Sequence, residues 1–196
     1  MKKPKKLTVN RLCLGLGIAL LVIASVVLIC WQVGIHTAQG QADAYVTTLR
    51  TLLPTPRSAA PEARLDNSMP VLAVDGADFV GILEMPQYGS AQPVGAAWGQ
   101  ISKYPCCFSG SVYDRSLQIG GSSQQGQYDF YREISVGDTV YFTDMEGNRF
   151  QYAVTDIRYE SHADQAALGQ QEAALTLFIK NVYAMEYILI FCDTAS

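Results

Sequence analysis

The fold of this chain is decided by the stretch TVYFTDMEGNRFQYAVTDIRY, residues 139–159. Two runs rich in Val, Tyr, Phe and Ile, Thr139–Thr143 and Arg149–Tyr159, flank a turn segment over residues 144–148. From residue 150 to 155, large apolar side chains alternate with smaller or polar ones, which is the period of a strand with one buried face. The stretch therefore predicts a β-hairpin.

Further runs of the same composition lie on both sides of this hairpin, separated by Gly, Asp and Pro. They are short and irregularly spaced, and only the segment 164–174 is expected to form a helical turn. This pattern indicates an all-β domain, either a compact barrel or a sandwich. The additional predicted strands are Val71–Val74, Phe79–Met85, Leu117–Ile119, Ala173–Ile179 and Tyr187–Phe191.

The composition limits both the size and the class of the protein. The chain has 196 residues, which is room for one ordinary domain, and its 49% hydrophobic content excludes disorder throughout. The net charge of −4 is uneven, because residues 1–11 carry five basic side chains and no acidic one. The rest of the chain carries the remaining nine basic and all 18 acidic side chains. An acidic domain repels phosphate, so we expect no nucleic-acid partner.

An uncharged apolar stretch, Leu12–Val33, follows the basic tail. As a helix rising about 1.5 Å per residue, it is long enough to cross a hydrocarbon core of about 30 Å. Because the basic residues precede it, we expect the N-terminus in the cytoplasm and the rest of the chain outside the cell. The alternative is a cleaved signal peptide, but the apolar run is longer than a signal core and segment 37–40 is a weak cleavage site. We therefore predict a cytoplasmic tail over 1–11 and a single-pass signal anchor in the cell membrane over 12–35.

A stalk is predicted between the anchor and the domain, over residues 36–70. Within it, Ala42–Leu53 places apolar side chains at helical spacing, and Pro54 and Pro56 end that helix. The prolines and alanines that follow are typical of a linker. From the sequence, the helix is either packed on the domain or a free spacer. The β-domain is predicted over 71–196.

Common catalytic and metal-binding motifs are absent from the sequence. It has no phosphate-binding Gly loop, no His-Glu-x-x-His and no Cys-x-x-Cys, and its two histidines, His36 and His162, are too few for a His-rich metal site. We therefore expect no cofactor and no metal. Three cysteines lie beyond the anchor, namely Cys106, Cys107 and Cys192. Either one of the adjacent pair is bridged to Cys192, or all three are reduced core residues.

A series of short motifs runs through the domain in a fixed order. They are Gly81-Ile82-Leu83-Glu84-Met85-Pro86, Pro93-Val94, Trp98, Tyr104-Pro105-Cys106, Ser109-Gly110-Ser111, Leu117-Gln118-Ile119-Gly120-Gly121, Val136-Gly137-Asp138, Val140-Tyr141-Phe142, Gly147-Asn148, Phe150-Gln151-Tyr152, Val154 and Leu175-Thr176-Leu177-Phe178. Over residues 78–192, their order and spacing resemble the sortase family. These are membrane-anchored cysteine transpeptidases of Gram-positive bacteria that attach proteins bearing a C-terminal sorting signal to the cell wall or to pilins. The resemblance implies an eight-stranded β-barrel.

The departures from the family pattern fall on its catalytic residues. Sortases have a histidine after Ile-x-Gly/Ala, a cysteine after Thr-Leu-x-Thr and an arginine on the next strand. The matching positions here are Ser122, Lys180 and Tyr187, or Glu186 if the register of the last strand shifts by one. Realignment does not restore the missing residues, because no histidine lies between residues 36 and 162 and no arginine follows residue 158.

Sortase chemistry needs a thiolate nucleophile, a proton donor and a cation at the developing oxyanion. All three residue types are missing from their places, so the resemblance implies a catalytically inactive pseudo-sortase. We expect such a protein to bind sorting-signal peptides or to assist the anchoring of surface proteins or pilins. In the peptide-binding form, Lys180 attracts a carboxylate and Tyr187 stacks or donates a hydrogen bond.

Three other interpretations stay open at this point. In the first, the protein is an active transpeptidase or peptidase with a dyad of Ser122 as nucleophile and Lys180 as base. In the second, Cys106 or Cys107 is a relocated nucleophile with His162 as its acid-base partner. In the third, the groove is closed and the domain is a purely structural surface module.

Overall fold

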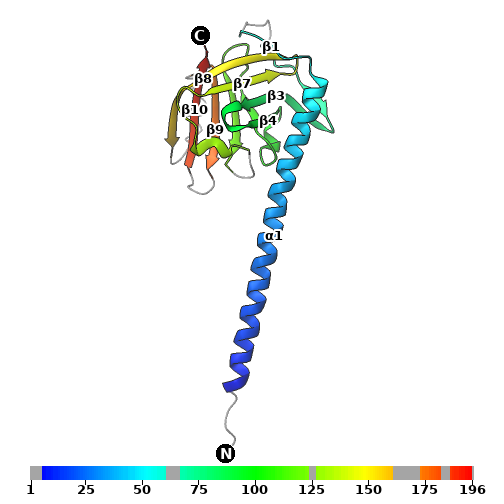
Figure 1. Cartoon of the computed structure of the whole chain (residues 1–196), viewed down its shortest axis with the longest axis vertical. Coiled ribbons are helices and arrows are strands. Elements are labelled where there is room, and N and C mark those ends of the chain that lie inside the picture. Colours follow the sequence, from blue (N-terminus) through cyan, green and yellow to red (C-terminus); the bar gives the residue numbers. More distant parts are fainter. Residues whose placement is uncertain (1–5, 61–66, 124–126, 161–172, 182–185, 196) are drawn as a thin grey trace, which may run out of the picture. The chain divides into compact units, whose positions relative to one another are not determined.

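The computed structural model describes residues 6–60, 67–123, 127–160, 173–181 and 186–195 (Figure 1). The chain divides into two compact units, Met1–Thr37 and Ala38–Ser196. The long helix α1, Lys6–Leu52, contributes to both units. The predicted helical turn over 164–174 lies largely outside the described residues.

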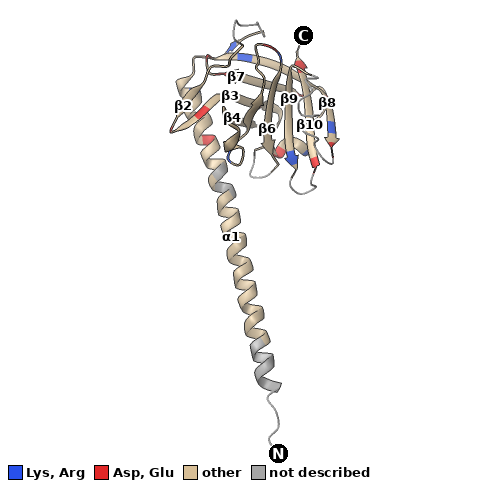
Figure 2. Ribbon diagram, turned by 180° about the vertical axis from the view of Figure 1, so that it is seen from behind, with Lys and Arg blue, Asp and Glu red and all other residues tan. Residues whose placement is uncertain are grey.

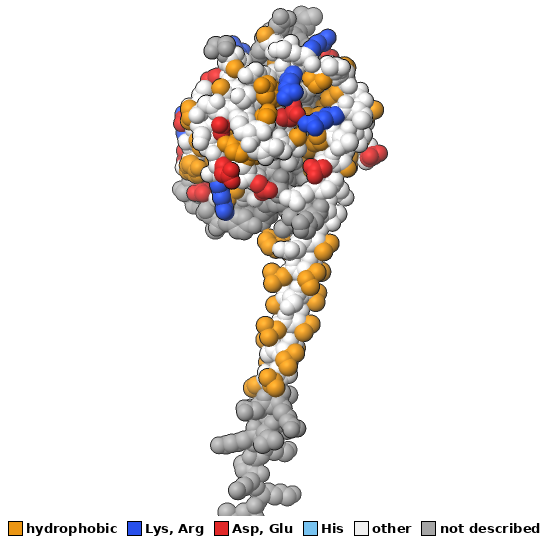
Figure 3. Space-filling view, in the orientation of Figure 1, with side chains coloured by type: hydrophobic (Ala, Val, Ile, Leu, Met, Phe, Trp, Pro, Cys, Tyr) orange, Lys and Arg blue, Asp and Glu red, His pale blue; other side chains and the backbone are white. Residues whose placement is uncertain are grey.

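The first unit consists of the N-terminal part of α1. Its described side chains are exposed and mostly apolar, as Figure 3 shows. Its most apolar window has a mean hydropathy of 2.9, and none of that window is buried inside the protein. The hydroxyl of Ser25 donates to the carbonyl of Leu21 at 2.8 Å, so the helix itself satisfies this polar group. This helix is long and apolar enough to cross a membrane.

The second unit is a β-barrel. Its described elements are the end of α1, β1 (Arg57–Ser58), β2 (Leu72–Val74), β3 (Ala77–Met85), β4 (Ser90–Gly95), β5 (Cys106–Ser109), β6 (Leu117–Ser122), β7 (Thr139–Asp144), β8 (Asn148–Glu160), β9 (Leu175–Asn181) and β10 (Glu186–Thr194), with short 3-10 helices at Pro86–Tyr88, Trp98–Gln100 and Asp129–Arg132.

Eight of these strands, β3 to β10, close into a ring within the described part of the chain. Strand pairing runs β8-β10-β9-β6-β5-β4-β3, and β7 closes the ring because it pairs with both β3 and β8. Around the ring, only β6–β9 and β4–β5 are parallel pairs. The predicted all-β class and the eight-stranded barrel are therefore confirmed.

The hairpin predicted over residues 139–159 forms β7 and β8. Its turn is organised by the buried carboxylate of Asp144, which accepts hydrogen bonds from the backbone N–H groups of Glu146 and Asn148 at 2.8 and 2.9 Å. Gly147 has a φ of +81°, a left-handed conformation that favours glycine. The hydroxyl of Tyr113 also donates to Asp144, at 2.5 Å. The carboxylate thus connects the hairpin turn to a distant loop.

The barrel interior is filled by alternate residues of the strands. Its main cluster includes Phe142 of β7 and Phe150, Tyr152 and Val154 of β8, the residues whose alternation predicted the hairpin. Tyr128 is fully buried in the same cluster. Side chains of opposite phase on each strand therefore point out of the barrel.

A second cluster covers the outside of β3 with the end of α1. Val46 and Leu49, three residues apart on the helix, pack with Phe79 and Tyr104. The ring of Tyr45 lies 4.9 Å from that of Phe79, centroid to centroid. The helix over 42–52 is thus packed on the barrel rather than free of it.

Candidate functional site

The three positions that the family resemblance aligns with the sortase catalytic residues lie in one row across neighbouring strands. Ser122 at the end of β6 is the register partner of Lys180 in β9, and Lys180 is the register partner of Tyr187 in β10. Their neighbours Ile179 and Ile188 belong to the interior cluster, so the row faces outward. The structure therefore brings these three positions together on the outer face.

The backbone at the Ser122 position is fixed by a buried amide. The Ser122 N–H donates to Oε1 of Gln127 at 3.1 Å, and Nε2 of Gln127 donates to the carbonyl of Ile101 at 3.0 Å. The Ser123 N–H donates to the Lys180 carbonyl at 3.1 Å, which extends the β6–β9 pairing by one residue. Hydrogen bonds of the backbone N–H groups of Ser122 and Ser123 thus fix the position of Ser122 beside Lys180.

Figure 2 shows one basic segment near the end of β9, and Lys180 is the only Lys or Arg of that strand. Its side chain is exposed. Within the described residues, its ammonium makes no hydrogen bond or ion pair. The nearby carboxylate of Glu186 accepts a hydrogen bond from Nδ2 of Asn181 at 3.0 Å. Tyr187, rather than Glu186, stands opposite Lys180. The row therefore presents a cation to solvent beside a half-buried phenol.

A second row, Gly120–Phe178–Leu189, runs beside the first on the same face. The ring of Trp98 lies 5.5 Å from Phe178, and that of Phe108 lies 5.2 Å from Trp98 and 5.3 Å from Phe178, between centroids. Phe178 is 3% exposed, whereas Trp98 and Phe108 are 43% and 41% exposed. These three rings form an aromatic cluster whose outer part is open to solvent. Sequence reasoning did not single out Phe108.

Gly120 is what allows this cluster to approach the sheet. A Cβ at this position would lie 2.5 Å from both Phe178 Cζ and Trp98 Cη2. The Trp98 ring therefore covers the backbone of β6, two residues before Ser122. In the sequence, the Gly120-Gly121 pair was the only sign that side chains crowd this strand.

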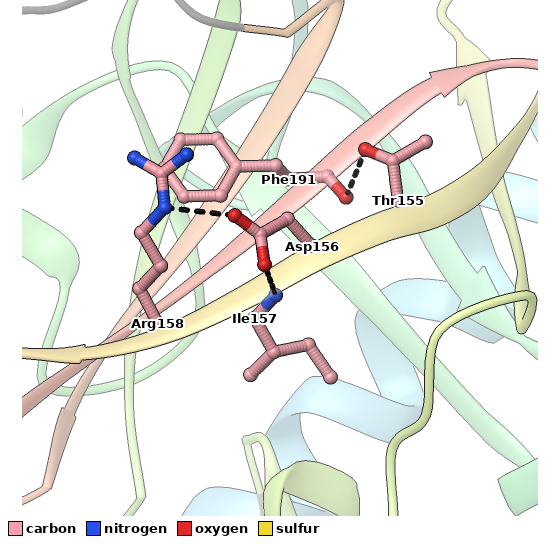
Figure 4. Close-up of polar contacts among 5 residues, drawn as sticks. All are labelled: Thr155, Asp156, Ile157, Arg158 and Phe191. Atoms are coloured by element: carbon pink, nitrogen blue, oxygen red, sulfur yellow. Dashed lines mark hydrogen bonds and ion pairs between the residues drawn. The ribbon is translucent and has the colours of Figure 1, made fainter.

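The outer face continues onto β8, as the close-up in Figure 4 shows. The Arg158 guanidinium lies 4.5 Å above the centroid of Phe191 and pairs with the Asp156 carboxylate at 2.8 Å. That carboxylate also accepts from the Ile157 N–H at 2.9 Å, and the Thr155 hydroxyl donates to the Phe191 carbonyl at 3.2 Å. This end of the face is thus occupied by polar contacts within the protein.

The cysteines beyond the anchor are free in the structure and poorly suited to act as nucleophiles. Burial raises the pKa of the Cys106 thiol to about 12 and that of Cys107 to about 11. Burial also raises the pKa of Cys192. A thiol with a raised pKa has almost no reactive thiolate at neutral pH. The suggested partner His162 lies outside the described residues.

Within the described ranges, no three His, Cys, Asp or Glu side chains come together as a metal ion would require. In the row of Ser122, the groups that could act as nucleophile and base are the Ser122 hydroxyl and the Lys180 amine. A lysine becomes a base when it is buried, and the exposed position of Lys180 does not supply that burial. The face is better equipped for binding than for proton transfer.

Comparison with solved structures identifies the fold. No protein-family model and no curated protein matches the chain. Sortase C1 from Streptococcus agalactiae superposes with a TM-score of 0.53 and 17% identity, over 64% of this chain and 72% of its own. Clostridium perfringens sortase C, solved with the C-terminal cell wall sorting motif, superposes with a TM-score of 0.51 and 16% identity, over 61% of this chain and 72% of its own. Listeria monocytogenes sortase A superposes with a TM-score of 0.50 and 16% identity, over 60% of this chain and 88% of its own.

These identities are low, so the comparison concerns the fold and not the reaction. The strand pairing closes the barrel in this chain, and the superpositions show that the solved neighbours share its fold. The chain therefore combines a sortase-like eight-stranded β-barrel with an N-terminal apolar helix long enough to cross a membrane.

Proposed function

We propose that this protein is a pseudo-sortase of the Gram-positive cell surface, which binds sorting-signal peptides of surface proteins or pilins without joining them to an acceptor. The observation that carries the proposal is the register row Ser122–Lys180–Tyr187, at the positions where the family resemblance expects histidine, cysteine and arginine. In this proposal α1 anchors the chain with its N-terminus in the cytoplasm, and the barrel is extracellular.

The row lacks the groups that sortase chemistry requires. A hydroxyl is a weak nucleophile unless a base removes its proton, and the exposed Lys180 is a poor base. Tyr187 carries no positive charge to stabilise an oxyanion. Losing all three functions together removes the reaction rather than slowing it.

The same face has the composition of a peptide-binding surface. The half-exposed rings of Trp98 and Phe108 offer apolar area at a low cost in side-chain entropy. Lys180 supplies an ammonium for a peptide carboxylate, and Tyr187 supplies a phenol. A peptide as the ligand of this face is supported by the similar structure of Clostridium perfringens sortase C, which was solved with a sorting motif.

The proposal is tested first for catalysis. The purified full-length chain in detergent is incubated with sorting-signal peptides and an amine acceptor, with an active sortase as positive control, and products are followed by mass spectrometry. We expect no cleavage or transfer. Turnover that disappears on substitution of Ser122 or Lys180 would overturn the proposal.

Binding is then measured by fluorescence polarisation with labelled peptides that carry a carboxylate. Lys180→Glu should weaken binding about five- to tenfold, the effect of reversing one exposed charge. Lys103→Glu, the same change at another exposed lysine, should leave the affinity unchanged. No binding to any of the three proteins would favour the closed structural module.

The register pairing of Ser122 with Lys180 also keeps an active dyad as a second candidate function. That dyad requires the Lys180 amine within hydrogen-bond reach of the Ser122 hydroxyl. It predicts a slow peptidase whose activity is lost in Ser122→Ala. An inactive wild-type chain with sorting peptides eliminates the dyad and leaves the binding proposal in place.

A further inference from the structure

A pocket of about 320 Å³ lies on the outside of the barrel, away from the row of Ser122 and over different strands. Its floor is a register row across β3, β7 and β8, formed by Ile82, Thr143 and Arg149. Leu53 and Pro54, which follow α1, form an apolar wall. A volume of this size lies at the lower end of the range of small-molecule sites.

The charged side chains of the pocket form an ion-paired group with one excess positive charge. Glu84 bridges two arginines, with Arg50 Nη2 2.6 Å from its Oε1 and Arg149 Nη2 3.1 Å from its Oε2. The Arg149 guanidinium also lies 4.1 Å above the ring centroid of Tyr141. Each guanidinium has five N–H donors, so the carboxylate uses only part of their capacity. Basic, acidic and hydrophobic side chains gather on the face that Figure 3 shows.

Thr143, which lines the same pocket, has a buried hydroxyl that finds no hydrogen-bond partner among the described residues. Thr143 is 3% exposed, and within the described residues its Oγ1 makes no hydrogen bond. A buried polar group left unsatisfied is unfavourable, so such groups generally find a partner. Because Thr143 is the register partner of Arg149, a ligand atom at this hydroxyl would also lie beside a guanidinium.

We propose that this pocket binds a small organic carboxylate. The single excess positive charge selects a monoanion, and the two oxygens of a carboxylate match the planar fork of an arginine while accepting from Thr143. The walls of Leu53, Pro54 and Ile82 accommodate a short apolar body. Glu84 holds the two guanidinium groups in place before the ligand arrives, which lowers the entropy lost on binding.

The test uses the full-length chain in detergent and isothermal titration calorimetry with N-acetyl-leucine, after subtraction of a titration into empty micelles. The probes for comparison are N-acetyl-leucinamide, which has the same apolar body and no charge, and inorganic phosphate. We expect the acid to bind at least tenfold more tightly than either. Equal binding of the acid and the amide, tighter binding of phosphate, or no binding of the acid would overturn the proposal.

Two variants locate the site. Arg149→Gln should weaken binding of the acid at least tenfold, and Thr143→Val, which keeps the side-chain shape, should weaken it about three- to tenfold. Thr139→Val changes the same strand outside the pocket and should leave the affinity unchanged. If Arg149→Gln does not fold, Thr143→Val decides alone, because an unchanged affinity in that variant would overturn the role of the hydroxyl and the site with it.

Discussion

Gly120 and Gly121 are adjacent in β6, and an alanine scan of the pair should give two different results. A Cβ on Gly121 points into the barrel and would lie 1.9 Å from Cε2 of Tyr128, a side chain with 0% exposure. Overpacking of a closed core costs about 1–3 kcal/mol, and the fully buried ring places this variant near the upper end. We expect Gly121→Ala to lower the melting temperature by about 4–12 °C for a unit of this size.

Gly120→Ala should be milder, because its Cβ points outward. The contacts at 2.5 Å are with Phe178 Cζ and with Trp98, whose half-exposed ring has solvent into which it can move. We expect a loss below about 1 kcal/mol, together with a displaced Trp98. Scanning calorimetry measures the stability of both variants.

Trp98 emission in a Trp31→Phe background reports the displacement, since the chain has only two tryptophans. A red shift in Gly120→Ala and none in Gly121→Ala is the expected result. The reasoning is refuted if Gly121→Ala is as stable as the parent, or if Gly120→Ala is the more damaging of the two.

Three further predictions concern packing and titration. Leu49→Ala, at a fully buried helix position against the barrel, should cost about 2–5 kcal/mol in thermal unfolding, and a loss below 1 kcal/mol would contradict the packing of α1. Cys106, whose pKa burial raises to about 12, should resist iodoacetamide at pH 8 until the protein is unfolded, as peptide mass spectrometry can show. Burial raises the pKa of Tyr88 and of Tyr104 to about 12 from an unfolded value near 10, so the unfolded chain loses these protons first. The stability that these two groups contribute should therefore be complete below about pH 10 and decline from about pH 10 to 12 in denaturant unfolding, and a flat profile over that interval would contradict it.

The strands that sequence could predict are those with their own hydrophobic pattern. Each end of the two hairpin strands, β7 and β8, was predicted to within one residue. This was possible because the alternation and a Gly-Asn turn lie within one short stretch. Strand β4 was missed, because Ser90–Gly95 has little hydrophobic pattern and contains Pro93. Its extended state follows from pairing along β3, and toward β5 it has only the single register pair Gly95–Cys106. Proline is tolerated there because one side of the strand is almost unpaired.

The functional residues also include some that the sequence could predict and some that it could not. The positions of Ser122, Lys180 and Tyr187 followed from the family resemblance, and the strand register shows that they are neighbours. The bridge from Arg50 through Glu84 to Arg149 joins three separate segments, so nothing local in the sequence indicates it. Contacts of this kind depend on barrel closure and become visible only when the strand order is known.

The exposure of the aromatic cluster bears on whether the outer face is open or closed. A barrel that had merely filled a groove would bury the filling side chains, as it does for Phe178 at 3% exposure. Trp98 and Phe108 instead keep 43% and 41% of their surface in solvent, which leaves hydrophobic area unused by the folded chain. On the same face, Lys180 has no ion pair among the described residues, although acidic side chains outnumber basic ones after residue 11. Exposed aromatic area is enriched at interfaces relative to other protein surfaces, so the two half-exposed rings favour an open face over a filled groove.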